Sequence, residues 1–304
     1  MTMAQVRRVT LADMNYLSTG KRTRLHRLLY GAGPGNGTLM LLPIDQGLEH
    51  GPRDFFPNPA AKDPEFQLRL ARDGKFSGIV FQIGIANKYM TQYAGVVPLV
   101  LKLNGKTEIP SDATPLSPLL ASVEDAVRLG AVAVGYTLYI GSAQQQADFI
   151  QFAHVREEAE RFGMPIIVWA YPRGDAIEAK GGRDSFYAID YAARVAAELG
   201  ADVVKVNTPK FAPDKDAKAP APYNATQFSM HDALSQVVQS AGKTLVIFSG
   251  GEKLAESSAV DKAREGMHAG GTGIIFGRNM WQRPMPEALQ LAGEIRTMLA
   301  DYSA

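Results

Sequence analysis

Short apolar runs alternate with longer amphipathic segments along most of the chain. Eight of the runs are rich in Val and Ile and largely continuous, which is typical of parallel strands covered on both faces. The runs are Thr38–Ile44, Gly78–Gln82, Val97–Leu103, Ala131–Thr137, Pro165–Trp169, Asp202–Asn207, Thr244–Phe248 and Thr272–Phe276. Polar loops separate the runs, so each is expected to form its own strand.

The segments between the runs carry apolar residues at three- and four-residue spacing, which predicts amphipathic helices. The expected helices are Pro64–Asp73, Ser122–Leu129, Gln144–Arg161, Ser185–Leu199, Asp232–Ser240, Ser257–Ala269 and Pro286–Leu299. Ser122, which is followed by Glu124 and Asp125, is a favourable helix start. Its hydroxyl can cap the first turn, and the carboxylates suit the positive end of the helix dipole.

Eight strands that alternate with helices predict an α/β fold, namely a (β/α)₈ TIM barrel that spans residues 1–304 as one domain. The alternative is an open doubly wound sheet, which would need a G-x-G-x-x-G fingerprint after the first strand. The sequence at that point is IDQGLEHGP and lacks the fingerprint. The barrel is therefore the favoured fold.

Three segments fall outside this alternation. Residues 10–31 contain LHRLLYG and are expected to add one or two helices that plug the bottom of the barrel. Residues 1–36 would then form an N-terminal helical extension packed on the barrel. Asp112–Pro118 and Phe211–Tyr223 are rich in proline, which predicts loops after the third and sixth strands rather than helices. The second of these loops is a candidate lid.

Composition and charge narrow the class of protein. The 304 residues include 32 Lys and Arg against 31 Asp and Glu, which argues against a nucleic-acid or membrane-surface partner. Cysteine is absent, so disulfides, thiolate metal ligands and cysteine nucleophiles are all excluded. The charged N-terminus has no apolar core, and the longest uncharged stretch, Leu129–Ala147, is too polar to span a membrane. The expected location is the cytoplasm.

The strongest chemical candidate is a lysine inside an apolar strand. The active site of a barrel lies at the C-terminal ends of its strands, and Lys205 stands there in the run DVVKVN. Burial of an ammonium group is costly and lowers its pKa, and a neutral amine can attack a carbonyl carbon to form a Schiff base. The competing interpretation is a lysine paired with a barrel carboxylate such as Asp45. The sequence leaves the two equally open.

Other side chains at the strand ends extend this hypothesis. Lys102, in VLKLNGK, is a second interior lysine, which suggests one nucleophile and one electrostatic partner. Tyr171 and Arg173 follow the fifth strand, and a Tyr beside lysines can have its pKa lowered toward acid–base use. A Tyr that merely packs on the rim is an equally common arrangement. Trp169 is expected to form a wall of the pocket.

Glycine-rich turns follow the seventh and eighth strands, where barrels commonly bind phosphate through exposed backbone N–H groups. The residues are Ser249, Gly250, Gly251, Gly277 and Arg278. The arginine adds a bidentate cation, and the combination favours a phosphate site over a pair of ordinary turns.

A resident metal is not expected. Among the five histidines, only His50 falls in a loop at the expected mouth, near Asp45 and Glu49. One histidine with two carboxylates is not a typical zinc site. An oxygen-ligand magnesium site stays open, although nothing in the sequence requires it.

Together these residues resemble the archaeal-type class I fructose-bisphosphate aldolases, from about Leu41 to Arg283. The matching segments are LPIDQGLEHGP, NPAAKDPEFQLRLARD, VPLVLKLNGKT, SVEDAVRLGAVAVGYTLYIGS, VWAYPRG, ELGADVVKVN, FSGG and FGRNMWQR. The resemblance implies a barrel enzyme of glycolysis and gluconeogenesis without metal or cofactor. Such an enzyme cleaves fructose 1,6-bisphosphate reversibly to dihydroxyacetone phosphate and glyceraldehyde 3-phosphate.

The resemblance also implies roles for individual residues. By position, Lys205 forms the imine and Tyr171 is the acid–base residue. Asp45, His50, Lys102, Trp169 and Arg173 line the substrate pocket, whereas Ser249, Gly250, Gly251, Gly277 and Arg278 hold the phosphate nearest the ketone. The family further suggests a homo-oligomer, and GRNMWQRPM around Trp281 could seal a subunit contact.

Two features depart from the family pattern, and several functions stay open. Many members have DHG where this chain has Gln46, and the Phe211–Tyr223 insertion could reshape the lid. Related Schiff-base enzymes act on other phosphorylated ketones, including a thiolase of the autoinducer pathway and a synthase of early aromatic biosynthesis. A flavin-dependent oxidoreductase and a non-catalytic sugar-phosphate sensor are the alternatives that form no imine.

Overall fold

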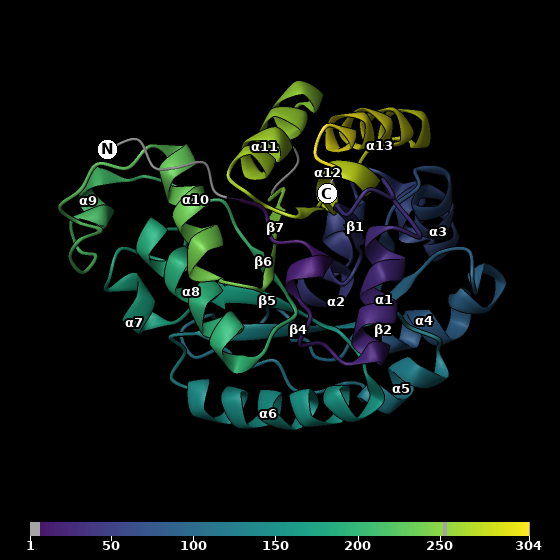
Figure 1. Ribbon diagram of the computed structural model, residues 1–304, viewed down its shortest axis with the longest axis horizontal. Helices are drawn as coiled ribbons and strands as arrows, with labels where there is room; N and C mark the ends of the chain where they lie inside the picture. Colours follow the sequence, from purple (N-terminus) through teal and green to yellow (C-terminus); the bar gives the residue numbers. More distant parts are fainter. Residues whose placement is uncertain (1–6, 252–253, 304) are drawn as a thin grey trace.

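Eight parallel strands close into a barrel in which each strand pairs with its neighbours in chain order (Figure 1). The computed structural model describes residues 7–251 and 254–303, so the first six residues of the expected N-terminal extension lie outside it. The strands are β1 Leu39–Pro43, β2 Gly78–Gln82, β3 Leu99–Lys102, β4 Ala133–Ile140, β5 Ile166–Pro172, β6 Val203–Val206, β7 Leu245–Ser249 and β8 Gly273–Ile275. The expected (β/α)₈ fold is confirmed.

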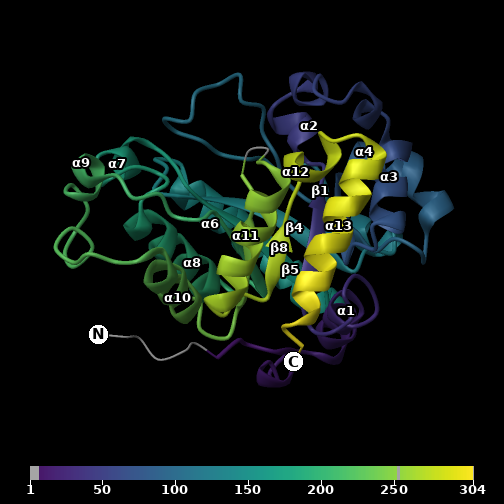
Figure 2. The ribbon, with the colours of Figure 1, turned by 90° about the horizontal axis from the view of Figure 1, so that it is seen from above.

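Helices surround the barrel, and those expected from the sequence are present within one or two residues of their predicted bounds. They are α3 Pro64–Asp73, α5 Val123–Arg128, α6 Gln145–Phe162, α8 Phe186–Leu199, α10 Met230–Ser240, α11 Glu256–His268 and α13 Met285–Ala300. Ser122 caps α5 as expected, in a reciprocal capping box with Asp125. Figure 2 shows α11 and α13 side by side over the last strands.

Several short elements do not follow from the sequence pattern. α4 (Ile83–Tyr89) fills the connection between β2 and β3, and α2 (Gln46–Glu49), α7 (Asp175–Glu178) and α12 (Arg278–Trp281) lie near the mouth of the barrel. The 3₁₀ turns are η1 Leu11–Asp13, η2 Pro52–Phe55, η3 Pro59–Lys62 and η4 Met90–Tyr93. One expectation was wrong: Phe211–Tyr223 contains one helical turn, α9 (Pro213–Asp216). Proline at the first helical position costs no hydrogen bond, so its presence did not exclude a helix there.

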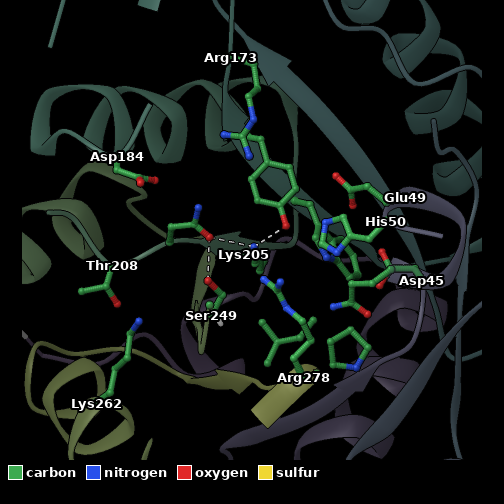
Figure 3. A pocket seen from close by; sticks show the side chains of 18 of the residues that line it. Asp45, Glu49, His50, Arg173, Asp184, Lys205, Thr208, Ser249, Lys262 and Arg278 are labelled. Atoms are coloured by element: carbon green, nitrogen blue, oxygen red, sulfur yellow. Dashed lines mark hydrogen bonds between the residues drawn. The ribbon is translucent and has the colours of Figure 1, made fainter. Parts of the chain in front are cut away.

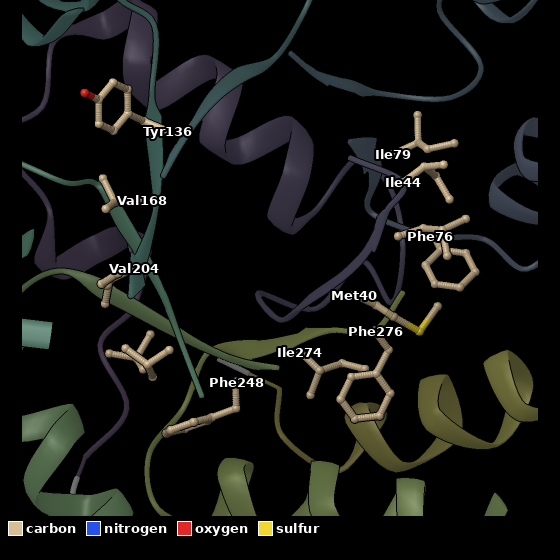
Figure 4. Close-up of a cluster of buried hydrophobic side chains, with 14 of the residues drawn as sticks. Met40, Ile44, Phe76, Ile79, Tyr136, Val168, Val204, Phe248, Ile274 and Phe276 are labelled. Carbon is tan, nitrogen blue, oxygen red and sulfur yellow. The ribbon is translucent and has the colours of Figure 1, made fainter. Parts of the chain in front are cut away.

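Two buried clusters hold the fold together. The larger one lies between the strands and the helix ring and includes Met40, Val168, Phe248 and Ile274 (Figure 4). The smaller one fills the barrel interior with inward-facing strand residues such as Val80, Val100 and Val203.

The N-terminal helix α1 (Thr19–Leu29) closes the bottom of the barrel. Its residues Leu25, Leu28 and Leu29 belong to the interior cluster, and each is at most 1% exposed. Lys21 on the same helix is also buried and forms ion pairs with Glu160 and, at 3.0 Å, with Asp202 at the start of β6. Apolar contacts and paired charges therefore both fix this helix. No helix in the described residues is long and apolar enough to cross a membrane.

Candidate functional site

A cavity of about 190 Å³ opens at the C-terminal ends of the strands (Figure 3). It contains every residue of the expected site except Lys102 and Gly250. The expected residues that line it are Asp45, His50, Trp169, Tyr171, Arg173, Lys205, Ser249, Gly251, Gly277 and Arg278. Residues that are far apart in the sequence meet here because parallel strands all end on the same rim of a barrel.

Lys205 points into the barrel because of its position along β6. Side chains alternate between the two faces of a strand, and Val203, two residues earlier, belongs to the interior cluster. The Lys205 side chain is 5% exposed. Its Nζ donates hydrogen bonds to Tyr171 Oη at 2.6 Å and to Asn207 Oδ1 at 3.1 Å. Both partners are neutral oxygens.

Burial controls the protonation of this lysine. Loss of water around the ammonium group lowers the pKa of Lys205 to about 7, and the positive charge of Arg173 acts in the same direction. The carboxylates of Glu49 and Asp45 oppose the shift. A large fraction of the amine is therefore uncharged near neutral pH, which is the form that attacks a carbonyl carbon.

Tyr171 lies directly beside this amine at the end of β5. Lys205 Nζ is 4.1 Å from the Tyr171 ring centroid, and the Arg173 guanidinium is 5.0 Å from the same centroid. Burial, followed by the charges of Glu49 and Asp45, raises the pKa of Tyr171 well above its ordinary value. The expected lowering of this pKa was therefore wrong. Tyr171 remains a phenol at neutral pH and can donate a proton.

Lys102 lies behind the cavity wall at the end of β3. Its Nζ donates to Asp45 Oδ2 at 3.0 Å and lies 5.0 Å from the Trp169 ring centroid. Asp45 thus pairs with Lys102, whereas the competing interpretation of the sequence paired it with Lys205. Trp169 forms part of the cavity wall, as expected, and lies opposite Lys205 in the register of β5 and β6.

The ends of β7 and β8 and the turns that follow them form another wall of the cavity. Ser249, Gly251, Gly277 and Arg278 line the cavity, and Gly251 has a positive φ of 70° that suits glycine. Gly250 packs away from the cavity lining: a Cβ there would lie 2.6 Å from Asn279 Nδ2. Gly250 is therefore required for close packing.

Several lining residues were missed by the sequence analysis. They are Pro43, Gln46, Glu49, Asp184, Asn207, Thr208, Lys210, Lys262 and Ile275. Asn207 could have been found, because it is two residues beyond Lys205 and faces the same side of the strand. Lys262 could not, because it reaches the cavity from α11, where the local pattern predicts only an amphipathic helix.

The remaining candidates concern metals and subunit contacts. His50 Nδ1 lies 2.7 Å from Asp54 Oδ2, and no group of three His, Asp or Glu residues suited to a metal occurs among the described residues. Trp281 is fully buried in its own chain, with its ring 5.1 Å from Phe55 and its Nε1 donating to Pro43 O at 3.1 Å. Trp281 itself is therefore not available for the subunit contact that the sequence placed around it, and that contact stays a prediction for the rest of the GRNMWQRPM segment.

Comparison with known proteins agrees with this geometry. The profile of the DeoC/LacD family aldolases matches residues 39–283. The fructose-bisphosphate aldolase class 1 of Thermoproteus tenax is 44% identical over 248 residues, which cover 81% of this chain and 84% of that protein. The same enzyme of Halobacterium salinarum is 36% identical, over 83% of this chain and 88% of its own.

Solved structures show the same likeness. An archaeal fructose-1,6-bisphosphate aldolase, with its catalytic Lys covalently bound to the carbinolamine intermediate, is 39% identical with a TM-score of 0.77, covering 91% of this chain and 99% of that one. The aldolase of Slackia heliotrinireducens is 28% identical with a TM-score of 0.83, over 97% and 93% of the two chains. The chain belongs to the DeoC/LacD family of aldolases. Within that family it groups with the archaeal-type class I fructose-bisphosphate aldolases.

Proposed function

We propose that this chain catalyses the reversible cleavage of fructose 1,6-bisphosphate to dihydroxyacetone phosphate and glyceraldehyde 3-phosphate. The observation that carries the proposal is the state of Lys205, a buried amine with a pKa near 7 in contact with the Tyr171 hydroxyl. The choice of fructose 1,6-bisphosphate as substrate rests on the relatives named above, which are fructose-bisphosphate aldolases. The chain is accordingly a lyase of the Schiff-base type.

Lys205 performs the covalent chemistry in this proposal. Its amine attacks the ketone carbon of the open-chain sugar, and loss of water gives a protonated imine. The iminium group then accepts the electrons of the carbon–carbon bond as that bond breaks, which leaves an enamine and releases the aldehyde. Protonation of the enamine and hydrolysis of the imine free dihydroxyacetone phosphate and return the amine.

Tyr171 is the proton donor closest to these events. Its hydroxyl lies 2.6 Å from Lys205 Nζ, within reach of the oxygen that leaves the carbinolamine as water. Because its pKa is raised, the phenol is protonated when this step requires a proton. Asn207 accepts from both Lys205 Nζ and, at 2.7 Å, Ser249 Oγ, so it orients the amine from the other side.

The phosphate nearest the ketone would bind at the turns after β7 and β8. Ser249, Gly251, Gly277 and Arg278 line the cavity close to Lys205 and offer a hydroxyl, exposed backbone and a guanidinium group. Asp45, His50, Trp169 and Arg173 would contact the rest of the sugar phosphate. Lys102 would act indirectly, by holding Asp45 in place.

The test is cleavage of fructose 1,6-bisphosphate by the purified chain, with and without EDTA. We expect full activity in both, because an imine replaces the metal ion as the electron sink. A borohydride-reduced adduct with dihydroxyacetone phosphate should map to the peptide that contains Lys205. Activity that EDTA abolishes and zinc restores would refute the proposal, and a yellow flavoprotein would indicate the oxidoreductase alternative.

Three further expectations follow from family membership. We propose a homo-oligomer, which light scattering at micromolar concentration tests directly, and a monomer would contradict it. The proposed location is the cytoplasm. The proposed domain organisation is a single barrel that spans the chain, with residues 1–36 packed on it, as the buried leucines of α1 suggest.

A further inference from the structure

An ion cluster at the rim of the barrel has no role in the chemistry described so far. Its centre is Asp112, in the loop between β3 and α5. Asp112 Oδ1 lies 2.8 Å from Lys106 Nζ. The other oxygen, Oδ2, lies 3.4 Å from Arg173 Nε and 3.6 Å from Arg183 Nη1. Of these four side chains, Arg173 is the one that lines the cavity, so the cluster reaches the site through it.

The loop that carries Asp112 is attached to the barrel on both sides of this residue. Before it, Glu108 N donates to Glu49 O at 2.8 Å, next to the mouth. After it, Ser142 Oγ donates to Pro115 O at 2.6 Å. Figure 2 shows the long blue loop at the same end of the barrel as α2 and α12. These attachments bring the carboxylate to the rim independently of its attraction to the cations.

The charges of the cluster do not balance. Among the described residues, Lys106, Arg173 and Arg183 form ion pairs with Asp112 and with no other carboxylate. Burial would raise the pKa of Asp112, but the three cations outweigh it and lower that pKa, so the carboxyl group is ionised at neutral pH. Three cations against one carboxylate leave an excess of two positive charges, which suits a phosphate dianion. Without Asp112, the three like charges would repel one another and move apart.

Asp112 also helps to fix the direction of the Arg173 guanidinium. Arg173 Nη1 donates to Pro172 O at 2.8 Å, while Nε faces Asp112. The guanidinium lies over the ring of Tyr171 as well. Nη2 has no hydrogen-bond partner in the part of the chain that the structure describes, so it is available to a ligand. A cation held in this way binds an anion without first losing side-chain freedom.

The position of Arg173 indicates which part of the substrate it meets. Figure 3 shows Arg173 and Arg278 on opposite sides of Lys205. In the proposed function, the ketone reaches Lys205 and the nearer phosphate lies by Arg278. The remainder of the sugar, with its second phosphate, then extends toward Arg173.

We propose that Asp112 is a positioning residue that holds Arg173 in place and thereby makes this site prefer a bisphosphate to a monophosphate. Asp112 touches no substrate atom in this proposal. It acts through Arg173, and it keeps the charges of Lys106 and Arg183 beside that guanidinium. The inference rests on the proposed function and concerns its specificity.

The test measures KM for fructose 1,6-bisphosphate in the full-length protein. Asp112→Asn keeps the size of the side chain but removes its charge, so KM should rise about 3–10-fold with little change in kcat. Arg173→Met should raise KM by about 10–100-fold. The double variant should be no worse than Arg173→Met alone, because Asp112 has no other route to the substrate.

A second readout uses dihydroxyacetone phosphate, which lacks the far phosphate. At pH 9, where the amine of Lys205 is uncharged, Asp112→Asn should need the same triose concentration as wild type for half-maximal inactivation by borohydride. This result would also show that the variant is folded. Asp214→Asn, on the exposed turn α9, is the matched control and should behave as wild type in both assays.

An unchanged KM in Asp112→Asn would overturn the proposal. A lowered KM would overturn it too, because Asp112 would then compete with the phosphate for Arg173. Additive effects in the double variant, or weaker binding of the triose, would mean that Asp112 acts on the site in general and not through Arg173. If the wild-type protein neither cleaves the bisphosphate nor forms an adduct, the proposed function itself fails, independently of the variants.

Discussion

The two lysines inside the barrel have similar burial and opposite surroundings. Lys102 at the end of β3 is 3% exposed, and Lys205 on β6 is 5% exposed. Lys102 Nζ contacts the Asp45 carboxylate at 3.0 Å, whereas the hydrogen-bond partners of Lys205 are the neutral oxygens of Tyr171 and Asn207. Lys102 therefore belongs to an ion pair, whereas Lys205 is an amine that burial makes easy to deprotonate.

This difference shows that burial alone does not make a nucleophile. Both lysines lose their hydration, but a carboxylate in contact stabilises the ammonium form and offsets that cost. Among the described residues, the carboxylates that act on Lys205 are the more distant ones of Glu49 and Asp45, which oppose its pKa shift without cancelling it. The placement of one carboxylate, Asp45, thus assigns different chemistry to the two lysines.

The largest effect should come from removal of the Lys205 amine. Lys205→Met keeps a side chain of similar volume but removes the nucleophile, so turnover should fall by roughly 10⁴-fold or more. Adduct formation with borohydride should also disappear, which mass spectrometry of the treated protein detects. Lys180→Met, on the exposed face beyond α7, is the matched control. An adduct on Lys102 or Lys210 would contradict the assignment of Lys205 as the nucleophile.

The next largest effect concerns the neighbour of the free amine. Tyr171→Phe keeps the ring and the pocket shape but removes the hydroxyl that contacts Lys205 Nζ. Loss of a positioned acid–base group should lower turnover by about 10²–10⁴-fold, and the borohydride adduct should form more slowly, because Tyr171 protonates the oxygen that leaves the carbinolamine. Wild-type turnover would show that water or another group transfers this proton. An adduct that forms at the wild-type rate would show that Tyr171 acts only after the imine has formed.

Stability should change in opposite directions for the two lysines. Lys102→Met leaves Asp45 buried without its partner and should lower the free energy of unfolding by about 3–5 kcal/mol. Lys205→Met removes an ammonium group that contacts no carboxylate in the part of the chain that the structure describes, and should raise the free energy of unfolding.

The pH dependence of this gain has a defined sign. Between pH 7 and about 10 the unfolded state holds a proton on Lys205 that the folded state has lost, so wild-type stability rises with pH. The advantage of Lys205→Met should therefore be largest below pH 7 and shrink above it. Urea denaturation of both variants at pH 6 and pH 9 measures this. Equal destabilisation by the two substitutions would contradict the contrast.

The smallest effect should be the pH dependence of adduct formation in the unaltered protein. Because the pKa of Lys205 is lowered to about 7, the rate should rise about tenfold per pH unit below pH 7 and level off above it. The rate of inactivation by borohydride with dihydroxyacetone phosphate, at low triose concentration, reports this directly. A midpoint near that of a free lysine would contradict the lowered pKa of Lys205.

The sequence by itself determined the barrel and which strand residues face its interior. Continuous Val- and Ile-rich runs between amphipathic helices can only be buried on both faces, which is the physical reason that all eight strands were predictable. The period of two along each strand then places Asp45, Lys102, Tyr171, Lys205 and Ser249 on the inner side, in step with buried residues such as Val100 and Val203. Most of the site that follows strand geometry was therefore found, although Asn207, which obeys the same rule, was missed.

Only the tertiary structure decided how those residues pair. Asp45 contacts Lys102 because β1 and β3 bring the two side chains together, and no local pattern distinguishes that pairing from one with Lys205. The raised pKa of Tyr171, the contact of Asp54 with His50 and the arrival of Lys262 from α11 depend likewise on packing between distant segments. Local sequence fixes the direction of a side chain along its strand. Its charge state depends on neighbours that the chain supplies only after it has folded.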